Sequence, residues 1–213
     1  YLSIEKILGY SKSDCIIHSK QELSNNNIIS FENIINDIKQ NIPIQYILGE
    51  AHFYDLKFKV NSSTLIPRGE TEELVQYILL HDFFSVLEIG TGSGCIAVSI
   101  AKNSNAKITA IDNSIGALEI AKSNAVLNSV EINFQLRDVF NFSEIKKYDL
   151  IVSNPPYVLD SEKKLMDKNV LDYEPHNALF VSDDDPLAYY KEIAKIATNN
   201  LNKNGLLFFE INE

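Results

Sequence analysis

From Pro67 onward, short apolar runs alternate with segments of helical pattern, and this alternation limits the possible folds more than any other feature. Strands are expected at 85–90, 107–112, 132–138, 148–154 and in LLFFEIN after Gly205. Helices are expected in GETEELVQYILL, at about 95–102, from an N-cap at Ser114 to about 127, and at about 186–201. Such alternation predicts an α/β domain with a mostly parallel sheet and right-handed crossovers.

The fifth expected strand ends near residue 213, so no further element covers its far side. A doubly wound sheet rarely ends in this way. We therefore expect the sheet of this chain to lack its C-terminal part.

The segment before Pro67 has a different character. Residues 1–43 carry apolar side chains at helical spacing, which predicts short helices with one apolar stripe; examples are Ile4, Ile7 and Leu8, then Ile34, Ile35 and Ile38. The chain opens with Tyr1, so this helical domain is expected to lack its beginning. Residues 44–66 alternate more like strands around Gly49 and Glu50, and we expect a β-hairpin linker there.

Charge and composition exclude several classes of function. The chain has 213 residues and a net charge of −10, which opposes broad electrostatic binding to nucleic acid. It has no apolar run long enough to span a membrane, and no signal peptide is recognised. Cys15 and Cys95 suit a reducing cytoplasm, and the four histidines share no ligand-like spacing, so no metal site is expected.

A glycine-rich turn follows the first strand of the α/β domain. Glu88-Ile89-Gly90-Thr91-Gly92-Ser93-Gly94 has the pattern GxGxG with an acid two residues before its first glycine. The Lys-Ser/Thr of a P-loop is absent, and Cys95 stands where a dinucleotide fingerprint has its third glycine. An acid at this strand end suits a ligand with an amine or sulfonium better than one with phosphates. The alternative is a tight turn with no ligand.

Two more acids end the next strands. Asp112 closes the strand 107–112, where an acid accepts hydrogen bonds from ribose hydroxyls. Asp138 closes the strand 132–138 and can accept from an adenine amino group, while the Val139 N–H donates to the ring and Phe140 covers it. A solvated Asp112 and a turn or cap role for Asp138 are the alternatives.

The segment Asn154-Pro155-Pro156-Tyr157, which ends the strand 148–154, is the most informative one. Neither proline donates a backbone hydrogen bond and each restricts the residue before it, so the corner is rigid. The Asn154 side-chain oxygen and the Pro155 carbonyl can both accept from one NH2 group. They would hold a planar amide or aryl amine with its nitrogen toward an electrophile, and Tyr157 can pack over it. A plain Asn-Pro turn is the alternative.

The glycine loop and NPPY together resemble the S-adenosylmethionine-dependent methyltransferases that act on exocyclic or amide nitrogens. The wider pattern more closely resembles the peptide chain release factor N5-glutamine methyltransferases. It consists of IPIQYILGEAHFYDLKFKVNSSTLIPRGETEELV, LEIGTGSG, SNPPYV and EPHNAL at 174–179, and the match spans essentially all of 1–213.

This resemblance implies a fold and a reaction. The fold is a helical substrate-docking domain (1–43), a hairpin linker (44–66) and a Rossmann-like methyltransferase domain (67–213). The family's first N-terminal helix and the last two of its seven strands are absent from this chain. The reaction methylates the side-chain amide of the Gln in the Gly-Gly-Gln motif of bacterial class-1 release factors, and it converts S-adenosylmethionine to S-adenosylhomocysteine.

The resemblance also implies residue roles. The substrate glutamine would be held by Asn154, Pro155, Pro156 and Tyr157. Cofactor-binding positions are Phe53, Arg68, Glu88, Gly90, Thr91, Gly92, Ser93, Gly94, Asp112, Asp138, Val139 and Asn154, with Leu65-Ile66-Pro67-Arg68 lining the methionine end. A structural ion pair with Glu70 or Glu72 is the alternative for Arg68. Gly69 stands where the family usually has proline, so a looser turn is expected there.

Two rival functions share these motifs. DNA and RNA amino-methyltransferases also use NPPY, but the acidic charge and the lack of a basic stripe or target-recognition insert argue against them. A non-catalytic scaffold would not need intact GTGSG and NPPY. We expect a cytoplasmic, monomeric enzyme without metal, bound to neither membrane nor nucleic acid. A fused tRNA methyltransferase domain beyond residue 213, as in some relatives, stays open.

Overall fold

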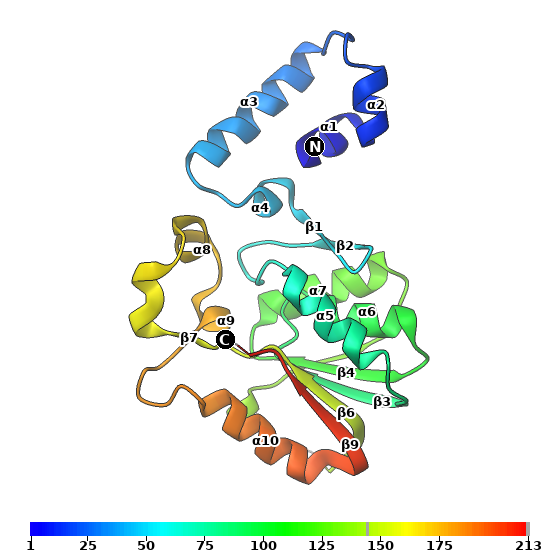
Figure 1. The fold of residues 1–213 in the computed structure, drawn as a ribbon, viewed down its shortest axis with the longest axis vertical. Coiled ribbons are helices and arrows are strands. Elements are labelled where there is room, and N and C mark those ends of the chain that lie inside the picture. The colour runs from blue at the N-terminus through cyan, green and yellow to red at the C-terminus, as the bar shows by residue number, and fades with distance from the viewer. Residues whose placement is uncertain (144, 212–213) are drawn as a thin grey trace.

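A five-stranded parallel sheet forms the core of the α/β domain, and the N-terminal helices lie away from it (Figure 1). The computed structural model describes residues 1–143 and 145–211. The sheet has the order β5-β4-β3-β6-β9 and all of its pairs are parallel. The strands are β3 (Ser85–Ile89), β4 (Lys107–Asp112), β5 (Asn133–Leu136), β6 (Tyr148–Ser153) and β9 (Leu201–Phe209). The predicted α/β class is therefore confirmed.

Helices cover both faces of this sheet (Figure 1). One face carries α5 (Gly69–Ile78), α6 (Cys95–Asn103) and α7 (Ile115–Leu127), and the other carries α10 (Ala188–Asn200). Val75 and Ile78 of α5 are fully buried against the first face, and Ile193 of α10 is fully buried against the second. Burial from both sides explains why these strands are nearly continuous apolar runs.

The N-terminal segment folds as helices, as its spacing predicts. They are α1 (Leu2–Leu8), α2 (Lys12–Ile17) and α3 (Asn25–Lys39). Ser11 and Ser24 cap the second and third of them by accepting backbone N–H groups, which fixes where each helix begins. Within residues 1–143 and 145–211, no helix has both the length and the apolar character needed to cross a membrane.

The hairpin expected within 44–66 spans only 50–59. Residues Ile44–Leu48 form the short helix α4, which ends at Gly49 with φ 69°. The hairpin consists of β1 (Glu50–Phe53) and β2 (Leu56–Lys59), and its turn residues Tyr54 and Asp55 have φ of 49° and 59°. The strand interpretation of 44–48 is wrong because Pro43 begins a helical turn and a left-handed glycine ends it.

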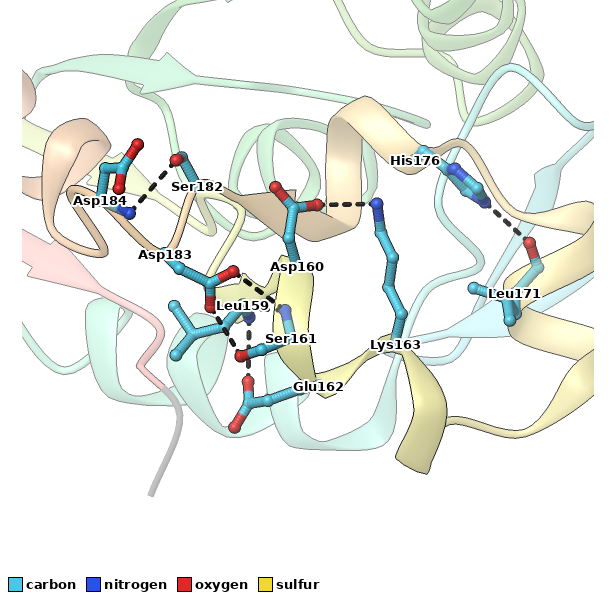
Figure 2. A network of polar contacts seen from close by, with 10 residues as sticks. All are labelled: Leu159, Asp160, Ser161, Glu162, Lys163, Leu171, His176, Ser182, Asp183 and Asp184. Atoms are coloured by element: carbon cyan, nitrogen blue, oxygen red, sulfur yellow. Dashed lines mark hydrogen bonds and ion pairs between the residues drawn. The ribbon is translucent and has the colours of Figure 1, made fainter.

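The segment after NPPY contains short elements. These are β7 (Val158–Leu159), the 3-10 helix η2 (Asp160–Leu165), α8 (Lys168–Tyr173), α9 (His176–Leu179) and β8 (Phe180–Val181). β7 and β8 pair in parallel, and Figure 2 shows the polar contacts beside them. Asp183 accepts from both the backbone N and the hydroxyl of Ser161, and Glu162 accepts from the Leu159 N–H. We call residues 155–187 the strap.

Candidate functional site

The candidate site lies where the carboxyl ends of the central strands meet. Ile89 of β3 is in register with Ile111 of β4 and Ser153 of β6, so the residues that follow these strands face one crevice. In the sheet, β3 has β4 on one side and β6 on the other, so the strand order changes direction at β3. Ligands of open α/β sheets bind at such a switch point. A cavity with an empty volume of about 1000 Å³, part of it open to solvent, occupies this position.

The glycine loop bends under that cavity. Gly90, Gly92 and Gly94 have φ of 75°, 55° and 80°, a left-handed conformation that side chains rarely adopt. A Cβ on Gly94 would also lie 3.1 Å from the Cβ of Ala121, because α6 and α7 approach closely there. The conformation of this loop therefore requires glycine at the three positions of the GxGxG pattern.

Glu88 supplies a buried carboxylate beneath the loop. Its residue surface is 1% exposed, and one oxygen accepts from the Thr91 hydroxyl. The other oxygen, Oε1, has no partner with ordinary hydrogen-bond geometry in the described part of the chain, and the nearby Ala97 N–H only slightly favours the charged form. Burial raises the pKa of this carboxyl to about 8. An unpartnered buried carboxylate that lines a cavity suits a ligand carrying an ammonium group.

Asp112 closes β4 on the same cavity. Its Oδ2 accepts from the Gly92 N–H and its Oδ1 from the Ser114 N–H, each at 2.9 Å. A carboxylate oxygen accepts more than one hydrogen bond, so both oxygens can still accept from ligand hydroxyls. Burial raises the pKa of this group as well.

Asp138, after the next strand, has the cap role that is the alternative to an adenine contact. Its carboxylate caps the 3-10 helix η1 (Val139–Asn141), accepting from the Phe140 N–H and from Asn141 Nδ2 at 3.0 Å each. Val139 lines the cavity, whereas Asp138 is not among the lining residues. The Phe140 ring packs against Tyr189, which does line it. An adenine contact of Asp138 stays a prediction.

The proline corner forms the opposite wall. Asn154, Pro155 and Pro156 line the cavity, and Asn154 Nδ2 lies 3.5 Å from the hydroxyl of Thr71 on α5. Ser153 fixes the end of β6, since its hydroxyl donates to the Ile89 carbonyl at 2.7 Å. Tyr157 lies just outside the set of lining residues. Asn154 and the two prolines therefore form a rigid part of the cavity wall.

Arg68 reaches across the site to the strap. Its Nη2 lies 2.6 Å from Oε1 of Glu174, whose side chain is 1% exposed, and Glu174 Oε2 accepts from the Ile66 N–H. The alternative pairing with Glu70 or Glu72 is not the one that forms with Arg68; Glu72 instead accepts from the Tyr54 N–H. Arg68 also lines the cavity, so its ion pair holds one wall of the site.

Comparison with known proteins identifies the family. Residues 68–179 match the family model described as methyltransferase small domain, and residues 1–49 match the PrmC N-terminal domain. The release factor glutamine methyltransferase of Flavobacterium psychrophilum is 46% identical over 222 residues, covering 100% of this chain and 78% of that protein. The chain belongs to the release factor glutamine methyltransferase family.

Two further comparisons concern the family and the fold. The release factor glutamine methyltransferase of Bacteroides thetaiotaomicron is 49% identical over 187 residues, covering 85% of this chain and 67% of that protein. A solved methyltransferase from Pyrococcus furiosus aligns with a TM-score of 0.55 and 19% identity, covering 83% of this chain and 77% of that structure. At that identity the likeness shows the methyltransferase fold alone.

The structure brings most of the expected site residues to one cavity. The lining residues among them are Arg68, Glu88, Gly90, Thr91, Gly92, Ser93, Asp112, Val139, Asn154, Pro155 and Pro156. Gly94, Asp138 and Tyr157 adjoin the lining in sequence without belonging to it. Phe53 is not brought there: it is 1% exposed and packs edge-to-face on Phe58 in the core of the α5–α6 face. Phe53 lies on strand β1 of the hairpin, and its large apolar ring is buried where the hairpin packs on that core.

Several residues at the site escape prediction from the sequence, among them Glu174, Tyr189 and Glu210. Glu174 belongs to EPHNAL, a segment that supports the resemblance without an assigned role, and its neighbours Asn177 and Ala178 line the cavity. Tyr189 carries no local motif. Glu210 follows β9, and its N–H donates to the Ser153 carbonyl at 3.1 Å, which places it beside the proline corner. The strand-end rule that selects Glu88 and Asp112 could have found Glu210.

Proposed function

We propose that this protein methylates the side-chain amide nitrogen of a glutamine in bacterial release factors, using S-adenosylmethionine. The observation that carries the proposal is the meeting of the glycine loop and the Asn154-Pro155 corner at one cavity. The glycine loop suits a methyl donor with an amino-acid end, and the Asn154-Pro155 corner suits a planar amide. The family membership of the chain supports the same reaction.

The donor side of the cavity fits S-adenosylmethionine. The unpartnered Glu88 Oε1 suits the amino group of its methionine part, and the oxygens of Asp112 suit its ribose hydroxyls. Val139 and Tyr189 offer apolar surface for the adenine. When bound, this cofactor supplies an electrophilic methyl group on a sulfonium and leaves as S-adenosylhomocysteine.

The acceptor side answers the main chemical problem. An amide nitrogen is a poor nucleophile because its lone pair is delocalised into the carbonyl. The Asn154 side-chain oxygen and the Pro155 carbonyl would accept hydrogen bonds from the two N–H groups of the substrate amide. These bonds would turn the lone pair of the amide nitrogen toward the methyl group. The N–C bond then forms as the C–S bond breaks with its electrons left on sulfur, and one N–H proton leaves afterwards to solvent. Positioning supplies most of the rate enhancement.

The substrate would be the Gln of the Gly-Gly-Gln motif, presented on a folded release factor. We propose that the N-terminal helices take part in docking it, since Ile16 and Ile17 of α2 are 75% and 73% exposed. An acidic chain with a net charge of −10 is poorly suited to a nucleic-acid substrate, which disfavours a DNA or RNA amino-methyltransferase.

One assay tests the proposal. Purified protein is incubated with methyl-labelled S-adenosylmethionine and, separately, with a bacterial release factor, DNA or RNA. Label on the release factor, located by mass spectrometry on the Gln of Gly-Gly-Gln, is the expected result. Label on nucleic acid alone, or on no substrate, would overturn it. A release factor with that Gln replaced by Glu is the matched control and should stay unlabelled.

A further inference from the structure

The proline corner fixes the backbone of Asn154 but does not determine which way its side-chain amide is turned. A side-chain amide has an oxygen and a nitrogen of similar size, and rotation by a half-turn exchanges acceptor and donor. Under the proposed function, only the rotamer with Oδ1 toward the cavity can accept from the substrate amide. The partners on the far side of Asn154 must therefore select between the two orientations.

Thr71 is the first of these partners. It is 2% exposed on the first turn of α5, and its hydroxyl lies 3.5 Å from Asn154 Nδ2. A hydroxyl both donates and accepts, so Thr71 alone would accommodate either orientation of the amide. Selection requires a further group that fixes which way the Thr71 hydrogen points.

Glu210 is placed to be that group. Its backbone is tied at both ends, because its N–H donates to the Ser153 carbonyl and its carbonyl accepts from the Tyr190 hydroxyl at 3.0 Å. Its carboxylate faces the side chains of Thr71 and Asn154: burial raises the pKa of this carboxyl, and hydrogen bonding to the two side chains opposes that rise. The buried oxygen Oε2 has no partner that meets ordinary hydrogen-bond geometry in the described part of the chain. An ionised carboxylate accepts only, so it attracts the Thr71 hydrogen and the Asn154 NH2 group and repels Asn154 Oδ1.

We propose that Glu210 is a positioning residue that, with Thr71, holds the Asn154 amide with its oxygen toward the substrate. The proposal rests on the proposed glutamine methylation. Glu210 touches neither substrate nor cofactor in this role and acts through Asn154. Among the described residues, the other charged or titratable groups near its carboxylate are Arg68, Glu70, Cys95, Tyr157 and Tyr190.

The test compares Glu210→Gln with the parent protein, using release-factor methylation as the assay. Glutamine keeps the shape but can turn its NH2 group toward Asn154 Oδ1, so it stabilises the reversed orientation that the carboxylate repels. We expect kcat to fall about 10- to 100-fold, the scale of a misplaced reacting contact. The Kd for S-adenosylmethionine, measured by calorimetry, should change by less than about twofold, since Glu210 does not line the cavity.

The pH profile separates orientation from a merely structural role. Burial raises the pKa of Glu210, so in the parent protein kcat should fall as pH drops through that raised value and the carboxylate is protonated. Glu210→Gln should lack this acidic limb. Glu70→Gln is the matched control: it removes a neighbouring negative charge that raises the same pKa, so it should move the limb to lower pH and keep kcat near neutral pH.

Failure of the inference is distinct from failure of the function. If the parent protein does not methylate the release factor, the proposed function is wrong, and the role of Glu210 falls with it. If the parent is active and Glu210→Gln retains its kcat, or retains the acidic limb, only the role of Glu210 is overturned. Should Glu210→Gln not fold, Thr71→Val breaks the same chain of contacts with the carboxylate intact, and normal kcat in that variant overturns the proposal.

Discussion

At the scale of single residues, substitutions at the two ends of the cavity should affect different steps: one should lower turnover and the other cofactor affinity. Asn154→Ala removes an acceptor for the substrate amide, so kcat should fall on the order of 10²–10³-fold, while the affinity for S-adenosylmethionine largely survives. Asp112→Ala removes the expected ribose contact and should weaken cofactor affinity instead. Kinetics and calorimetry on both variants check the division. Near-normal turnover in Asn154→Ala, or unchanged affinity in Asp112→Ala, would contradict the assigned roles.

The Arg68–Glu174 ion pair joins two walls of the site. Glu174→Gln removes the charge opposite Arg68 but keeps an acceptor for the Ile66 N–H. Because Arg68 is about one-third exposed, we expect a modest loss of about 1–2 kcal/mol in the free energy of unfolding. Cofactor affinity should also fall severalfold, since Leu65–Arg68 line the cavity. Thermal unfolding and calorimetry measure both, with the exposed Glu70→Gln as control; equal behaviour of the two variants would disprove the structural role.

At the scale of elements, helix α5 begins at a residue that tolerates proline. Gly69 occupies the first helical position, a Cβ added to it would meet no packed neighbour within 4 Å, and Arg68 before it has the extended φ and ψ of −105° and 149°. Proline fits the first helical position and restricts the unfolded chain. Gly69→Pro should therefore stabilise the protein by about 0.4–1 kcal/mol. Denaturant unfolding tests this, and a loss of stability would show that the backbone there differs from a helical N1 position.

Elements are easier to predict than their long-range partners. The strands, the glycine turn and the Ser114 cap follow from local patterns, because each depends on neighbours within a few residues. The Arg68–Glu174 pair joins positions 106 residues apart, so the local acids Glu70 and Glu72 are the visible alternatives in the sequence. Helix α4 escapes prediction because five residues carry too little periodicity to distinguish a turn of helix from a strand. Resemblance alone puts Phe53 at the cavity, and only the packing of the hairpin shows where its ring lies.

At the scale of the whole molecule, the site imposes a pH dependence on folding. Glu88, Asp112 and Glu210 all have a raised pKa, and burial is the main cause in each case. The folded chain then binds more protons than the unfolded chain, above about pH 5 and up to the pKa of about 8 of Glu88. Stability should therefore be highest near the acidic end of this window and decrease as pH rises through it.

The ligand-free protein should consequently lose thermal stability between pH 5 and 8, by about 2–4 °C in Tm for each 1 kcal/mol lost. Glu88→Gln removes the largest of these titrations and should flatten the dependence. S-adenosylmethionine should flatten it too, since its ammonium group stabilises the ionised Glu88, and its binding near pH 7 should release a proton. Calorimetry in buffers of different ionisation enthalpy measures that release. A Tm that rises from pH 5 to 8, or binding without proton release, would show that Glu88 is ionised in the empty site.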